Sequence, residues 1–498
     1  MRKHRLPSLL VMLHLVFIVS PSAVNPGRAE VLTAMMKATD FMMNTVSAYG
    51  GFVWKYSLDL SIRYGEVKAR NSMVWVEPPG TPTVGEMLIE AWLVTGDDAY
   101  KQYAERIAET VIKGQLSCGG WHYFIDLDTI GLQEYYRDYL STIWGWEEHQ
   151  KYYGNATFDD ETTVAATRFL LRLYAATYND RYRRSVHKAL SFILDSQLPN
   201  GGWPQRAPAV KIASDGEETD YTQYATFNDD VIHNNIMLLL ESWHTLNDSR
   251  YRESARRGMD FFILSQIPPP QSGWAQQYNR RLQPAPGRKF EIGTVCAGET
   301  VTNIEHLLDY YRYTGDRRYL EPIPRALQWL EESAGQIPLK HYSHTYYYEI
   351  GSNKPVYMHV KGEKQDRYFV QSYQFDGAYP YGHKLHINTS KLRQEYLHIA
   401  SLTPIEARME FDLLFDLQRR QPKINLISSG LDYRTTAKDS EEVRLLIGGL
   451  DSRGGWIVQN EILDEQDFIH NPPNRFYGYD TGTYVTRMYR LINFLRDN

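Results

Sequence analysis

Hydrophobic residues recur at steps of three and four along much of the chain, which is the spacing of helices with one buried face. One helix type precedes a glycine-rich turn, as in YAERIAETVIKGQ, RRSVHKALSFILDSQ and RESARRGMDFFILSQ. A second type alternates with it and opens on polar residues that predict N-caps, as in FDDETTVAATRFLL, FNDDVIHNNIMLLL and CAGETVTNIEHLL. Isolated helix pairs cannot bury their faces. The pattern therefore predicts a mainly α fold, an (α/α) toroid or barrel of repeated helix pairs.

Four Gly-Trp turns follow these helices, at Trp121, Trp203, Trp274 and Trp456. Trp121 and Trp456 lack glutamine neighbours, and we interpret them as plugs of the repeat interface. The second and third turns carry side chains suited to sugar hydroxyls and carboxylates, although these tryptophans could equally plug the interface. The residues predicted to bind substrate there are Trp203, Gln205, Arg206, Trp274, Gln276, Gln277 and Tyr278.

The pattern divides the chain into four parts. Residues 1–29 read as a signal peptide, with a basic start and a short apolar run. Residues 30–334 carry the (α/α) repeats. Residues 335–400 include HYSHTYYYEIGSNKPVYMHV, which predicts a β-hairpin within a β-rich flap. Residues 401–498 are expected to hold helices that complete the barrel.

Composition and charge limit the classes of partner that the protein is expected to bind. The formal net charge is −6, which gives no indication of a nucleic-acid or membrane partner. The signal peptide predicts a secreted protein, and no later segment is apolar enough to cross a membrane. We expect a monomer. Cys118 and Cys296 permit one disulfide or two buried thiols.

Acidic residues are doubled where two successive helices begin. Asp159, Asp160 and Glu161 open one helix, and Asn228, Asp229 and Asp230 open the next. Helix capping would explain one acid at each position. Doubled acids repel one another unless a cation lies between them, and hard oxygen ligands suit calcium. We therefore predict metal ligands or catalytic carboxylates here.

A basic loop follows the third turn, RRLQPAPGRKFE, in a chain of negative net charge. Arg280, Arg281, Arg288 and Lys289 could form an ordinary solvated loop. Beside two acidic clusters, however, its arginines are suited to bind a carboxylated substrate.

The ordered motifs FDDETTVAATRFL, NGGWPQR, ATFNDDVIHNNIMLLL, SGWAQQYN, GRKFE and YYYEIGSNKPVY resemble those of the family 10 pectate lyases, over roughly residues 145–385. The resemblance implies calcium-assisted β-elimination on a uronate polysaccharide, with Ca²⁺ as cofactor. It implies that Arg288 is the base, that Asp159 acts at the catalytic centre and that Asp229 binds the metal. The doubled acids add Asp160 and Asp230 as predicted metal ligands. Asn228 would line the cleft.

Two departures from the family pattern bear on the substrate. Asp159-Asp160-Glu161 stands where Asp-Asn-Gly is usual, and Val360-Lys361-Gly362 stands where Arg-Asp-Gly is usual. Lys361 would then replace a substrate-binding arginine, and an acidic glycan other than pectate is possible.

Two other functions stay open. A glycoside hydrolase on the same fold could use Asp159 and Asp229 as acid and base. A relative without its base could bind glycan and leave it uncut. An ultraviolet-absorbing unsaturated product and sensitivity to chelators would distinguish the lyase from both.

Overall fold

The computed structural model describes residues 26–143, 154–209, 220–337, 342–362, 368–375, 385–416, 421–422, 440–462 and 473–497. Most of the predicted signal peptide lies outside this part of the chain. Helix α1 begins at Arg28, so cleavage after Ala29 would fall in its first turn. Among the described residues, no helix has both the length and the apolar character that a membrane span requires.

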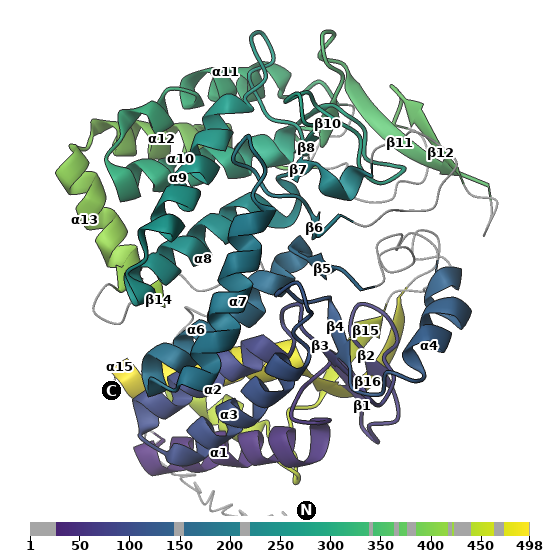
Figure 1. The fold of residues 1–498 in the computed structure, drawn as a ribbon, viewed down its shortest axis with the longest axis vertical. Helices are drawn as coiled ribbons and strands as arrows, with labels where there is room; N and C mark the ends of the chain where they lie inside the picture. Colours follow the sequence, from purple (N-terminus) through teal and green to yellow (C-terminus); the bar gives the residue numbers. More distant parts are fainter. Residues whose placement is uncertain are drawn as a thin grey trace, which may run out of the picture.

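The fold is mainly α and consists of repeated helix pairs, as the sequence predicted (Figure 1). Inner helices pack in the order α13, α10, α8, α6, α2, α15. Their bounds are α2 Thr81–Thr95, α6 Thr162–Thr177, α8 Val231–Leu246, α10 Ala297–Thr314, α13 Pro404–Leu414 and α15 Thr481–Asp497. The outer helices are α1 Arg28–Phe41, α3 Asp98–Lys113, α7 Asp180–Ser196, α9 Ser249–Leu264, α11 Ile323–Ser333, α12 Thr389–Ser401 and α14 Ser440–Gly448. A short helix, α4, spans Leu132–Asp138.

Short antiparallel strand pairs connect the repeats at one rim of the toroid, visible as a diagonal row in Figure 1. Each pair joins the segment before an inner helix to the next Gly-Trp turn or its equivalent, so the inner-helix starts are gathered at this rim. The pairs are β3 Met73–Trp75 with β4 Phe124–Asp126, β5 Ala156–Thr157 with β6 Arg206–Ala207, β7 Ala225–Thr226 with β8 Gln277–Tyr278, and β9 Val295–Cys296 with β10 Tyr347–Tyr348.

The Gly-Trp turns share one packing arrangement. The indole N–H of Trp121, Trp203, Trp274 and Trp456 donates, at 2.8 Å in each case, to a backbone carbonyl in or at the end of the preceding outer helix. In three of the turns the first glycine, such as Gly201 at φ 99°, has a left-handed conformation that favours glycine. The prediction that Trp121 and Trp456 plug the repeat is confirmed. Trp203 and Trp274 do the same.

This arrangement predicts the effect of Trp203→Phe. The change leaves the buried Ile193 carbonyl without its donor, so we expect a loss of about 1–3 kcal/mol in the free energy of unfolding, measured by urea denaturation. Trp92→Phe is the control, because its indole bonds to Asp98 at the surface, where water can replace it. Equal losses in both variants would contradict the prediction.

The C-terminal part differs in two ways from the prediction. The hairpin is confirmed, since β10 pairs with β11 (Pro355–Lys361), and β12 (Tyr368–Ser372) extends that sheet. The predicted flap, however, ran to residue 400, whereas α12 already begins at Thr389.

The second difference is a sheet that the sequence did not predict. Strands β15 (Val458–Ile462) and β16 (Asn474–Asp480) join β1 (Lys55–Ser57) and β2 (Arg63–Tyr64) in the order β15-β16-β1-β2. A further short pair is β13 (Phe415–Asp416) with β14 (Gln421–Pro422). Both Cys118 and Cys296 are free thiols, so the disulfide alternative is excluded in this structure.

Candidate active site

Two equivalent turns carry the doubled acids. The short helical turns Asp159–Glu161 and Asn228–Asp230 precede α6 and α8. In each turn two consecutive residues are left-handed: Asp160 and Glu161 at φ 47° and 58°, Asp229 and Asp230 at φ 49° and 55°. Such a backbone costs about 1–3 kcal/mol per non-glycine residue and is typical of functional sites. No side chain of these acids caps its helix, so capping does not explain the doubling.

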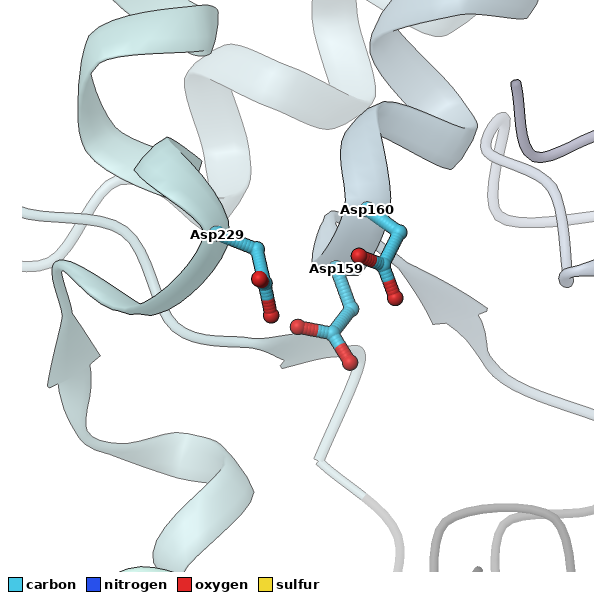
Figure 2. A group of neighbouring side chains, drawn as sticks. All are labelled: Asp159, Asp160 and Asp229. Carbon is cyan, nitrogen blue, oxygen red and sulfur yellow. The ribbon is translucent and has the colours of Figure 1, made fainter. Parts of the chain in front are cut away.

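The turns bring three carboxylates together. Oxygen atoms of Asp159, Asp160 and Asp229 all lie within 4.8 Å of one another. Figure 2 shows Asp229 approaching from one helix start and Asp159 and Asp160 from the other, with their carboxylates directed toward the same space. We call these three residues the acidic cluster.

Asp159 is buried and held by three donors. Its Oδ2 accepts hydrogen bonds from the Tyr123 hydroxyl at 2.6 Å and from Gln205 Nε2 at 2.7 Å. Its Oδ1 accepts from Asn228 Nδ2 at 3.4 Å, and Gln276 Nε2 donates in turn to Asn228 Oδ1 at 2.6 Å. Two of the glutamines predicted to bind substrate, Gln205 and Gln276, thus lie in the site, where they fix Asp159 and Asn228.

The predicted base faces this cluster. Arg288 Nη2 lies 3.7 Å from Asp159 Oδ2, and Arg288 Nη1 lies 3.8 Å from Glu291 Oε1. Glu291 also accepts the Arg288 backbone N–H at 2.8 Å, which fixes the loop. The predicted proximity of Asp159, Asp229 and Arg288 is therefore present.

Desolvation and like charges together raise the pKa values of two carboxyl groups in the cluster. The side chain of Asp229 is exposed, but the surrounding protein displaces part of its water. This desolvation, and then the charge of Asp159, raises the pKa of Asp229 well above its ordinary value. Desolvation, then the charge of Asp229, likewise raises the pKa of Asp160. The site holds more negative charge than its surroundings neutralise, a condition that a bound cation would relieve.

A neighbouring acid gives a pH-dependent prediction. Burial raises the pKa of Glu299 from 4.5 to about 8, so the folded protein holds this proton more tightly than the unfolded chain does. The resulting stability is full below about pH 4.5 and is lost as the pH rises through 8. With chelator present, we expect the free energy of unfolding of Glu299→Gln, relative to that of wild type, to increase by on the order of 3 kcal/mol between pH 5 and pH 9. Urea denaturation of both proteins measures this difference. The exposed-acid control Glu332→Gln should show no such trend, and a pH-independent difference for Glu299→Gln would contradict the prediction.

Several predicted site residues lie elsewhere. Trp203 and Trp274 are 0% exposed and Tyr278 is 1% exposed, so none can stack on a sugar, which corrects their predicted role. Asp230 is not one of the carboxylates that converge in the acidic cluster, and its Oδ1 instead accepts a hydrogen bond from His306 Nε2. Its predicted metal-binding role is not supported by this geometry.

Three other residues predicted to bind substrate lie outside the acidic cluster. Arg206 is buried, donates to Asn155 and lies over the Tyr123 ring. Gln277 is buried beside Gly287, where an added Cβ would come within 2.3 Å of its Nε2. Lys361 is exposed at the end of β11, opposite Tyr368.

Sequence reasoning missed residues on the same rim. Tyr123 stands two positions after Trp121, as Gln205 does after Trp203, and this shared offset could have identified it. Glu77 lies four positions before Thr81, as Asp159 lies four before Thr163, and both threonines bond the backbone of a preceding turn. Glu77 is buried, and its pKa is raised well above the ordinary value by burial first, then by Glu66, with Asp159 and Asp229 contributing.

Comparison with known proteins supports the resemblance seen in the motifs. The sequence profile described as pectic acid lyase matches a segment that contains both acidic turns and the helices α6, α7 and α8. Residues 133–246 match the pectic acid lyase family. The predicted resemblance is confirmed over this segment. No curated protein matches the chain.

Solved structures of three kinds are similar at low identity. A family 10 polysaccharide lyase from Cellvibrio cellulosa is 16% identical, with 65% of this chain and 98% of that chain covered and a TM-score of 0.41. A D-mannose isomerase is 10% identical, with 95% and 98% covered and a TM-score of 0.43. A family 76 α-mannanase from Bacteroides thetaiotaomicron is 9% identical, with 94% and 96% covered and a TM-score of 0.41. We draw no conclusion on activity from these likenesses.

Proposed function

We propose that this protein is a secreted polysaccharide lyase that cleaves a uronate-containing polysaccharide, pectate foremost, by calcium-assisted β-elimination. One observation carries the proposal: the guanidinium of Arg288 lies 3.7 Å from a carboxylate of the acidic cluster on the rim of the toroid. The matching family segment, residues 133–246, contributes the cluster itself.

The acidic cluster fits a calcium ion. It offers carboxylate oxygens, the hard ligands that calcium prefers, from two chain segments fixed at facing helix starts. Desolvation, and then the negative charge of Asp229 and of Asp159 respectively, raises the pKa values of Asp160 and Asp229, and a divalent cation would offset this like-charge repulsion. When bound, calcium would supply positive charge that binds the uronate carboxylate and stabilises the charge developing on it. Asp160 and Asp229 would hold it, with Asp159 adjacent.

The chain's own groups would do the remaining chemistry. Arg288 would accept the proton from C5 of the uronate, the C–H electron pair would become the C4=C5 double bond, and the C4–O bond would break, with water protonating the leaving oxygen. Asp159, fixed by Tyr123 and Gln205, would orient the guanidinium. A guanidinium ordinarily keeps its proton, so the site must favour the neutral form when substrate is bound.

An inverting hydrolase fits less well. An inverting hydrolase needs its two carboxylates about 6.5–9.5 Å apart to admit a water molecule. Oxygen atoms of Asp159 and Asp229 lie within 4.8 Å of each other, which leaves less room.

Product analysis tests the proposal. Polygalacturonate, alginate and glycosaminoglycans are incubated with the protein, with and without chelator, and ultraviolet absorbance is followed. We expect an absorbing unsaturated product from at least one uronate substrate, lost on chelation and restored by calcium. New reducing ends without absorbance would indicate hydrolysis instead, and binding without either signal would indicate a non-catalytic glycan-binding protein.

A further inference from the structure

Each left-handed turn ends in an acid directed away from the acidic cluster. After Asp160 comes Glu161, which is 3% exposed and has its Oε2 3.5 Å from Arg168 Nη1. After Asp229 comes Asp230, whose Oδ1 accepts a hydrogen bond from His306 Nε2 at 3.0 Å. The same arrangement thus occurs twice, once at the start of α6 and once at the start of α8.

The basic partners are themselves fixed to neighbouring inner helices. Arg168 is buried on α6 and also donates its Nε–H to Glu241 of α8 at 3.1 Å. The His306 ring, on α10, stacks on His233 of α8 with ring centroids 3.5 Å apart and planes 8° from parallel. Arg168 and His306, which we call the anchors, therefore both belong to inner helices of the toroid.

The turns need such anchoring. Their left-handed residues are strained, and the carboxylates of Asp160 and Asp229 repel each other across the site, so both forces favour relaxation of the turns. An acid at the next position, held by a basic group on an inner helix, resists this relaxation.

We infer that Glu161 and Asp230 are positioning residues, and that their contacts with Arg168 and His306 hold Asp160 and Asp229 in place to bind a divalent cation. The inference rests on the cation site of the proposed function and does not require that the protein be a lyase. It replaces the metal-ligand role that the sequence indicated for Asp230.

The direction in which cation affinity changes when an anchor is removed tests the positioning role. His306 and Arg168 carry no negative charge, so charge effects alone predict that removing either leaves cation affinity unchanged or makes it tighter. Loss of a positioning contact predicts weaker binding. His306→Phe is the most useful variant, because it retains a ring that can stack on His233 and loses only the donor to Asp230.

The experiment titrates the full chain with calcium by calorimetry, with terbium luminescence as a second probe and no substrate present. We expect His306→Phe to bind about tenfold more weakly than wild type, as outer-shell changes commonly do. His306→Gln, whose amide can still donate to Asp230, should stay within about twofold. Arg168→Met should also bind more weakly where it folds, and circular dichroism checks the folding of each variant.

The outcomes separate the two proposals. Unchanged or tighter calcium binding by folded His306→Phe overturns the positioning role while the cation site stands. Equal weakening in His306→Phe and His306→Gln also overturns it, because the donor would then be irrelevant. A wild-type protein that binds neither ion overturns the cation site and the positioning role together, whatever its activity.

Discussion

Arg288→Ala is expected to lower kcat by at least about 10³-fold, because general base catalysis typically contributes 10²–10⁴-fold. Arg288 is the one arginine in its loop with a guanidinium facing the acidic cluster among the described contacts. Turnover is measured by ultraviolet absorbance, and oligouronide binding by calorimetry should change by no more than about tenfold, since calcium and the remaining contacts still hold the substrate carboxylate.

Two further variants sharpen this result. Arg280→Ala removes the same charge from an exposed position of the same loop and should leave kcat within about twofold. Arg288→Lys keeps a positive charge but lacks the planar fork that lies between Asp159 and Glu291, so its activity should remain well below wild type. Full activity in Arg288→Ala would exclude Arg288 as the base.

Asp229→Asn has the second largest expected effect, a loss of at least about 100-fold in calcium affinity, beyond the 10–100-fold that outer-shell changes produce. The change removes one of three carboxylates and retains the size of the side chain. The calcium concentration for half-maximal activity should rise accordingly, while kcat at saturating calcium should fall much less.

Asp180→Asn provides the matched control, because it removes an equally charged acid from the exposed start of the outer helix α7. Its calcium profile should coincide with that of wild type. If Asp229→Asn also retained the wild-type profile, the acidic cluster would not be the calcium site.

The outer helices were predictable because each buries one face, so that its apolar residues recur every three or four positions. The inner helices are buried more completely, as in α6, where every residue from Thr162 to Leu173 is buried. The sheet that joins β1 and β2 to β15 and β16 was not predictable, since β1 and β2 have only three and two residues and too little alternation to mark a strand. Its pairing also connects segments more than 400 residues apart, as in Lys55 with Asp480.

Part of the site was predictable for a chemical reason and part was not. Doubled acids at two helix starts indicated a cation site because repulsion makes them costly without one. Which acids join the cluster and which contact Arg168 or His306 depends on the three-dimensional course of each turn, which spacing cannot show. The sequence around Trp203 and Trp274 could fill either a core or a sugar site, and only burial distinguishes these roles.

The pairing of β1 with β16 has a consequence for biosynthesis. As the ribosome extends the chain, Lys55 to Ser57 emerge hundreds of residues before their partners Gly478 to Asp480. The edge of β1 that β16 will cover therefore stays available to other strands until β16 has been synthesised. Chaperone engagement of the nascent chain should persist to that point, and stalling translation before residue 474 should leave it sensitive to protease near β1.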